Sequence, residues 1–229
     1  MMQRRLVAKW ALYSVVAVLA VVGVVIVVLR MVELTGTFLG GAVPAADSYD
    51  GGFAHRPGLT LLHILPGFVF AVLGPFQFVA GIRSRYIGLH RWCGRVYVAS
   101  GLVVGVTALI LGIVVGFGGT METTAVTVFS ALFLAFLGRA LFHICRREVA
   151  AHREWMIRAF ALGLSVVTMR PLIGALTALT QLSFADSLGV SFWLAFPLHL
   201  ALAECWVAYT RVRKESTSTA PVQASLPRP

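Results

Sequence analysis

Long apolar stretches alternate along this chain with short polar ones. A helix crosses the roughly 30 Å hydrocarbon layer of a membrane in about 20 apolar residues. Stretches that meet this requirement cover residues 10–29, 59–80, 92–116, 123–144, 155–181 and 191–210. Backbone groups in lipid must find hydrogen-bond partners within their own segment, so each stretch is expected to be helical. The pattern predicts an all-α, polytopic membrane bundle of six transmembrane helices within residues 1–214.

Basic residues gather in every second gap between these stretches. They are Arg4, Arg5 and Lys9, then Arg83, Arg85, Arg91 and Arg95, then Arg146, Arg147 and Arg153, and finally Arg211, Arg213 and Lys214. The other gaps are neutral to acidic, with Glu33, Asp47, Asp50, Arg56, Glu122 and Asp186. By the positive-inside rule, both termini are predicted to be cytoplasmic. Residues 215–229, rich in Ser, Thr, Ala and Pro, are predicted to be a disordered cytoplasmic tail.

Composition supports the same class of protein. Hydrophobic residues make up 59% of the chain and charged residues only 12%, about half the usual share in a soluble domain. The net charge of +10 follows from the basic loops, and no basic patch with interleaved aromatics indicates nucleic-acid binding. Cys93, Cys145 and Cys205 lack metal-ligand spacing and are interpreted as small apolar fillers.

Histidines and small residues share helix faces on three of the predicted helices. The stripes are His63, Gly67, Phe70 and Gly74, then His90, Gly94, Tyr97, Gly101 and Gly105, and finally His152, Met156, Ala159, Gly163 and Arg170. Small residues at this spacing allow two helix backbones to pack closely. The same residues also leave room for a flat ligand beside the histidines. The two interpretations are compatible.

Counting along the helices sorts the intramembrane polar groups into two layers. The outer layer holds His63, Arg170 and His199, and the inner layer holds His90, Arg139, His143, His152 and Glu204. Because an unpaired charge in a membrane is costly, Arg139 and Glu204 are predicted to form an ion pair. Arg170 has no obvious acidic partner, so it suits a carboxylate, phosphate or other anionic group of a ligand.

Three segments resemble the signature of a large family of bacterial predicted membrane proteins, the domain of unknown function 2306 family. They are His63 and Gly67 leading to the sequence GPFQF at 74–78, the sequence LHRWCGRVY at 89–97, and HREWMIRA at 152–159 followed by Arg170. The resemblance implies a multi-pass protein of the bacterial plasma membrane and supplies no reaction. His143 and His199 lie outside this signature. The segment from His90 to Gly94 is also loosely similar to the third helix of cytochrome b561-type haem proteins.

Several functions are compatible with these residues. One hypothesis is electron transfer through a b-type haem or a quinone between helices, because haem iron takes histidine nitrogen. His90 with His152 or His143 is the inner candidate ligand pair, His63 with His199 the outer pair, and Arg170 or Arg139 is the candidate partner of a propionate. The alternatives are a binding or transport module for a small amphiphile or ion, in which Pro66 and Pro75 break their helix, and a structural accessory subunit that contacts only membrane lipid. No hydrolase, transferase or metalloenzyme motif is present.

Overall fold

The prediction of an all-helical membrane fold is confirmed. The computed structural model describes the backbone of residues 2–218 and the side chains of residues 13–37 and 39–211. In this part of the chain there are helices and no strands, and six of the helices are long and apolar enough to cross a membrane. They are α1 (Met2–Phe38), α3 (Pro57–Phe78), α5 (Ile87–Val114), α6 (Gly119–Cys145), α7 (Val149–Leu179) and α8 (Phe184–Ser218).

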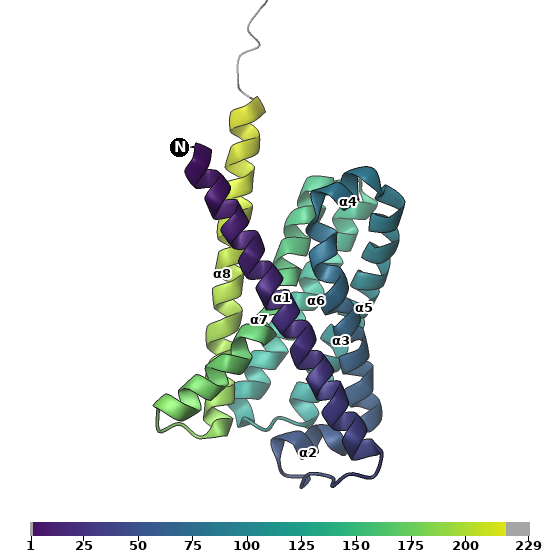
Figure 1. The fold of residues 1–229 in the computed structure, drawn as a ribbon, viewed down its shortest axis with the longest axis vertical. Coiled ribbons are helices and arrows are strands. Elements are labelled where there is room, and N and C mark those ends of the chain that lie inside the picture. The colour runs from purple at the N-terminus through teal and green to yellow at the C-terminus, as the bar shows by residue number, and fades with distance from the viewer. Residues whose placement is uncertain (1, 219–229) are drawn as a thin grey trace, which may run out of the picture.

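Two short helices, α2 (Tyr49–Ala54) and α4 (Ala80–Arg85), mark the opposite ends of the bundle (Figure 1). Ser48 caps the N-terminus of α2, where its side chain accepts a hydrogen bond from the Gly51 amide at 3.0 Å. Both described ends of the chain lie at the end that carries α4 (Figure 1). We call this the basic end, after Arg83, Arg85 and Arg146, and the other the α2 end. That the basic end faces the cytoplasm stays a prediction.

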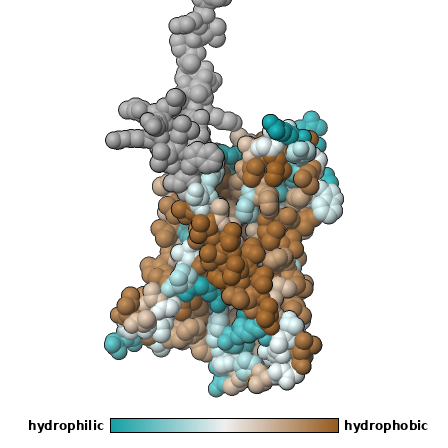
Figure 2. All heavy atoms as spheres, viewed as in Figure 1, coloured by the Kyte–Doolittle hydropathy of each residue, from teal (hydrophilic) through white to brown (hydrophobic). Residues whose placement is uncertain are grey.

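The core lies where α7 packs on α8 and α6 and where α3 packs on α5. Tyr97 of α5, Leu137 of α6 and Leu162 of α7 are almost fully buried there. Helix α1 crosses the outside of the bundle and packs on α3 and α7 (Figure 1). On the face shown in Figure 2, hydrophobic side chains cover most of the middle of the molecule, and hydrophilic ones gather mainly toward its two ends. This distribution is typical of a protein whose middle faces lipid.

Several helices begin before the apolar stretches that predicted them, and α8 also extends past the end of its stretch. Helix α7 begins at Val149 rather than at residue 155, and α8 begins at Phe184 rather than at residue 191. Residues 215–218, predicted to be tail, are helical, and residues 219–229 lie outside the described residues. Pro66 and Pro75 lie within α3, so the prediction that they break this helix is wrong. Hydropathy marks only the part of a helix that lies in hydrocarbon, which explains the longer elements.

Candidate functional site

The segment HREWMIRA at the start of α7 holds α7 against its neighbours at the basic end. His152 Nδ1 donates to the Ala140 carbonyl of α6 at 2.8 Å. Glu154 forms an ion pair with Arg211 of α8, whose Nε lies 2.6 Å from Glu154 Oε1. These polar groups have partners on α6 or α8, so most of the polar part of this segment serves helix packing.

Glu204 of α8 pairs with Arg158, and not with Arg139 as we predicted. Arg158 Nε lies 2.5 Å from Glu204 Oε1 and its Nη2 lies 2.8 Å from Oε2, a bidentate arrangement. The guanidinium of Arg139 lies instead over the ring of Trp155, 4.6 Å from its centroid. Arg158 approaches the same ring at 4.6 Å, so both cations contact Trp155. The charge on Glu204 is therefore held by α7 rather than by α6.

Arg158 was missed because the start of α7 was placed too late. With α7 beginning at Val149, Arg158 lies nine residues into the helix, or about 13 Å along its axis. A helix beginning at residue 155 would have left Arg158 near the water boundary. Its side chain is only 10% exposed, which makes an acidic partner necessary.

The remaining inner histidines occupy different environments. His143 Nδ1 lies 2.5 Å from Glu148, in the short connection between α6 and α7. His90 of α5 is close enough to His152 for the two to interact electrostatically, and its Nδ1 is buried without a hydrogen-bond partner among the described residues. The structure thus brings His90 near His152, while their pairing as haem ligands stays a prediction.

Most of the glycines on the predicted stripes serve close packing. A Cβ atom added at Gly163 would lie 2.6 Å from Phe70, and one added at Gly105 would lie 2.6 Å from Leu134. Gly67 differs, because a Cβ atom there would meet only a methyl group of Val104 at 3.8 Å. The glycines therefore fit both interpretations of the sequence: several allow helices to approach, and Gly67 borders open space.

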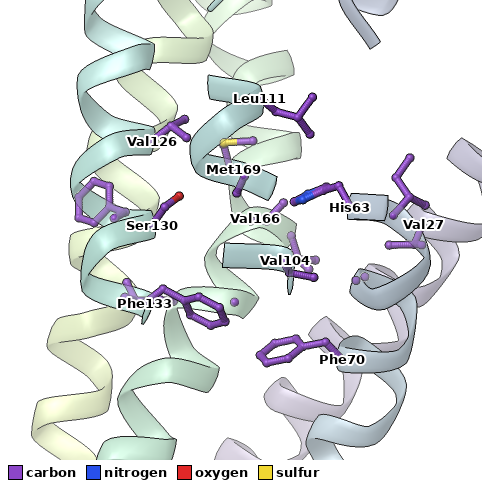
Figure 3. Close-up of a pocket in the computed structure, with 18 of the residues that line it drawn as sticks. Val27, His63, Phe70, Val104, Leu111, Val126, Ser130, Phe133, Val166 and Met169 are labelled. Atoms are coloured by element: carbon purple, nitrogen blue, oxygen red, sulfur yellow. The ribbon is translucent and has the colours of Figure 1, made fainter. Parts of the chain in front are cut away.

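That open space is a cavity of about 310 Å³ toward the α2 end. Helices α1, α2, α3, α5, α6, α7 and α8 contribute to its walls, which are mainly apolar. Its polar lining residues are Arg30, Tyr49, Thr60, His63, Glu122, Ser130 and Arg170. Figure 3 shows His63 of α3 pointing into the cavity from one side, with Ser130 of α6 and Met169 of α7 on the other. The structure thus places His63 and Arg170 in the walls of one cavity.

His199, the other outer histidine, does not line this cavity. It is buried, and its Nε2 lies 2.8 Å from the Thr168 hydroxyl, between α8 and α7. Sequence position gave His199 the same depth as His63 but could not give its direction around the helix. Among the described residues that line the cavity, His63 is the only histidine.

Two arginines bring positive charge to the cavity. Arg170 has no hydrogen-bond or ion-pair partner among the described residues. Arg30 of α1 pairs through Nη1 with Glu33 at 2.7 Å and with Asp50 of α2 at 2.8 Å. Its other terminal nitrogen, Nη2, is buried and unpartnered among the described residues. The walls of the cavity therefore contain arginine hydrogen-bond donors that the described residues pair only in part.

Arg30 and Glu122 were not predicted as site residues. Glu122 was assigned to an outer loop, but it lies in the first turn of α6 and is 7% exposed. Its carboxylate accepts a hydrogen bond from the Gly118 amide at 2.5 Å. A carboxylate in the first turn of a helix interacts favourably with the helix dipole, and this position was the available signal.

Fold and hydropathy together define a multi-pass helical integral membrane protein. The chain belongs to the DUF2306 family, described as predicted membrane proteins, whose pattern matches residues 60–207. The resemblance inferred from the three sequence segments is therefore confirmed, and the family description names no reaction. No curated protein and no solved structure matches the chain.

Proposed function

We propose that this protein binds a small amphiphile that carries an anionic oxygen group. The observation that carries the proposal is the mainly apolar cavity with Arg170 in its wall and no partner for that arginine among the described residues. An ionisable group within a membrane protein is costly unless it is paired, and its presence there indicates a function. A ligand carboxylate or phosphate would supply the missing charge.

The cavity suits the apolar part of such a ligand. Sites for small molecules are mainly apolar, hold a few placed polar groups and measure roughly 300–1,000 Å³. The cavity has this character, and its 310 Å³ lies near the lower end of that range. Phe70 and Phe133 line it together with aliphatic side chains (Figure 3). These walls favour a flexible chain or a flat ring as the body of the ligand.

This arrangement supports an amphiphile better than a haem between the outer histidines. A haem with two axial histidines needs both to face one space. His63 faces the cavity, whereas His199 is engaged by Thr168 between α7 and α8. A quinone is itself a flat amphiphile and belongs to the ligands to be tested.

The test uses purified full-length protein in nanodiscs of phosphatidylcholine. Fluorescent cis-parinaric acid supplies a carboxylate, its methyl ester supplies the same body without charge, and dodecyl phosphate is the phosphate competitor. We expect the acid to bind more tightly than the ester. Arg170→Gln should weaken binding of the acid by about tenfold or more, because a charge-assisted hydrogen bond contributes about 1.5–3 kcal/mol.

Matched control variants show whether a loss of binding comes from a change in the cavity or from substitution in general. Gly67→Leu adds bulk within the cavity, whereas Gly138→Leu adds the same side chain on α6 where a new Cβ atom meets nothing within 4 Å. Arg85→Gln removes an exposed arginine at the basic end and is the control for Arg170→Gln. The proposal is wrong if Gly67→Leu binds cis-parinaric acid as well as Gly138→Leu does. If Arg170→Gln and Arg85→Gln bind cis-parinaric acid equally well, Arg170 does not contribute to the binding site.

A further inference from the structure

We infer that the ligand of this cavity also carries a hydroxyl group, which donates a hydrogen bond to His63 Nε2. The inference rests on the proposed function and narrows the class of ligand from anionic amphiphiles to hydroxylated ones. It follows from the hydrogen bonds that fix the proton of the imidazole ring. Those bonds lie on α3 and α5, whereas Arg170 lies on α7.

Thr107 of α5 determines which nitrogen of His63 is protonated. The Thr107 hydroxyl lies 2.7 Å from the Val103 carbonyl oxygen, one turn back along the helix. A carbonyl oxygen only accepts, so the single hydroxyl proton of Thr107 lies in this bond. His63 Nδ1 is 2.9 Å from the same hydroxyl oxygen. Because the hydroxyl has no second proton to give, Nδ1 must be the donor.

A neutral imidazole with a proton on Nδ1 has a lone pair on Nε2. The groups among the described residues that hydrogen-bond the ring, the Thr107 hydroxyl and the Val104 backbone, both lie on α5. The His63 ring points into the cavity, toward the side formed by Val166 and Met169 (Figure 3). The cavity therefore contains an acceptor at His63 in addition to the arginine donors. A bound oxygen that only accepts hydrogen bonds would leave this lone pair unsatisfied, whereas a hydroxyl would satisfy it.

The neighbouring charges do not change the proton count on His63. Glu122 is the acidic group in the cavity wall, and it already accepts a hydrogen bond from the Gly118 amide. Arg30 and Arg170 in the same wall are both cations, so neither supplies a negative charge that would favour a second proton on the ring. Thr60, which lies beside His63 on α3 in the wall, donates its hydroxyl hydrogen bond to the Phe53 carbonyl oxygen at 2.8 Å. His63 thus stays a neutral acceptor toward the cavity.

The first measurement concerns the protein without ligand. Nitrogen-15 spectra of histidine-labelled protein in nanodiscs, assigned by comparison with His63→Phe, report which ring nitrogen is protonated. We expect a protonated Nδ1 and an unprotonated Nε2 for His63. Thr107→Val should change this spectrum by removing the acceptor of the Nδ1 proton. A His63 ring protonated at Nε2 in the wild-type protein would overturn the inference.

The second measurement compares ligands. Dodecanoic acids with a hydroxyl near the head, in mid-chain or at the far end compete with cis-parinaric acid, and each is paired with its methoxy counterpart, which cannot donate. We expect at least one hydroxy acid to bind about fivefold more tightly than its methoxy partner, the effect of one neutral hydrogen bond. His63→Phe should abolish this preference, while His199→Phe, outside the cavity, should retain it.

The outcomes distinguish this inference from the proposed function. Binding of cis-parinaric acid without preference for any hydroxy acid would overturn the hydroxyl inference and leave the proposed function standing. A preference that survives in His63→Phe would also overturn it. Failure of the wild-type protein to bind any of these acids would overturn both.

Discussion

The basic end and the cavity differ in whether their charged side chains have partners. At the basic end, Arg158 is bound by both oxygens of Glu204, and Glu154 by Arg211. At the cavity, Arg170 has no partner among the described residues. Both regions contain residues of the family signature, so membership of the signature does not by itself indicate a ligand site. The difference teaches that residue type alone does not reveal the role of a charged side chain. A side chain paired with another helix holds the helices together, whereas one without a protein partner is available to a ligand.

The largest effect should come from breaking the charge pair at the basic end. Glu204→Gln leaves the buried Arg158 guanidinium without its counter-charge, which should lower the free energy of unfolding by about 3 kcal/mol. Replacing both residues with leucine should recover much of this loss, since neither charge is then unpaired. Reversible unfolding in mixed detergent micelles measures both values.

The same measurement tests the corrected partner. Arg139→Gln and Glu204→Gln should have additive effects, to within about 0.5 kcal/mol, because Arg139 contacts Trp155 rather than Glu204. Strong coupling between Arg139 and Glu204, with additivity between Arg158 and Glu204, would restore the pair predicted from the sequence.

A smaller effect should separate a packed glycine from a cavity glycine. Gly163→Leu forces a side chain against Phe70 and should lower the free energy of unfolding by about 2 kcal/mol. Gly67→Leu places the same side chain where a new Cβ atom has 3.8 Å to its nearest neighbour, so its cost should be well below that. Equal losses in the two variants would show that the space beside Gly67 is not available.

The smallest effect is expected at Arg170. Arg170→Gln removes a cation that forms no ion pair with the described residues, so the ligand-free protein should lose no stability. With saturating cis-parinaric acid, however, the wild-type protein should gain more thermal stability than the variant, because a ligand stabilises the state that it binds. A large loss of stability without ligand would identify Arg170 as a structural residue.

Hydropathy sufficed to predict the six described helices that are long and apolar enough to cross a membrane, because it depends on the order of residues along the chain. The orientation predicted from the basic loops stays a prediction. Counting residues also gave approximate depths for Arg170 and His63, which share one cavity. Depth does not specify the direction in which a side chain points around its helix. His199 was therefore grouped with His63, although it faces Thr168. The partner of Glu204 was wrong for a related reason, since the exact start of α7 is not visible in hydropathy.

The first transmembrane helix gives the cavity a wall that lies outside the family match. Ala20, Gly23, Ile26, Val27 and Arg30 of α1 line the cavity, yet the family match begins at residue 60. His63, Thr107 and Arg170 all lie inside the matched region. Arg30 and one side of the enclosure thus lie outside the matched region, whereas these three polar residues lie inside it. A family member with the same three residues and a different first helix would keep the chemistry of recognition and alter the shape and size of what it admits.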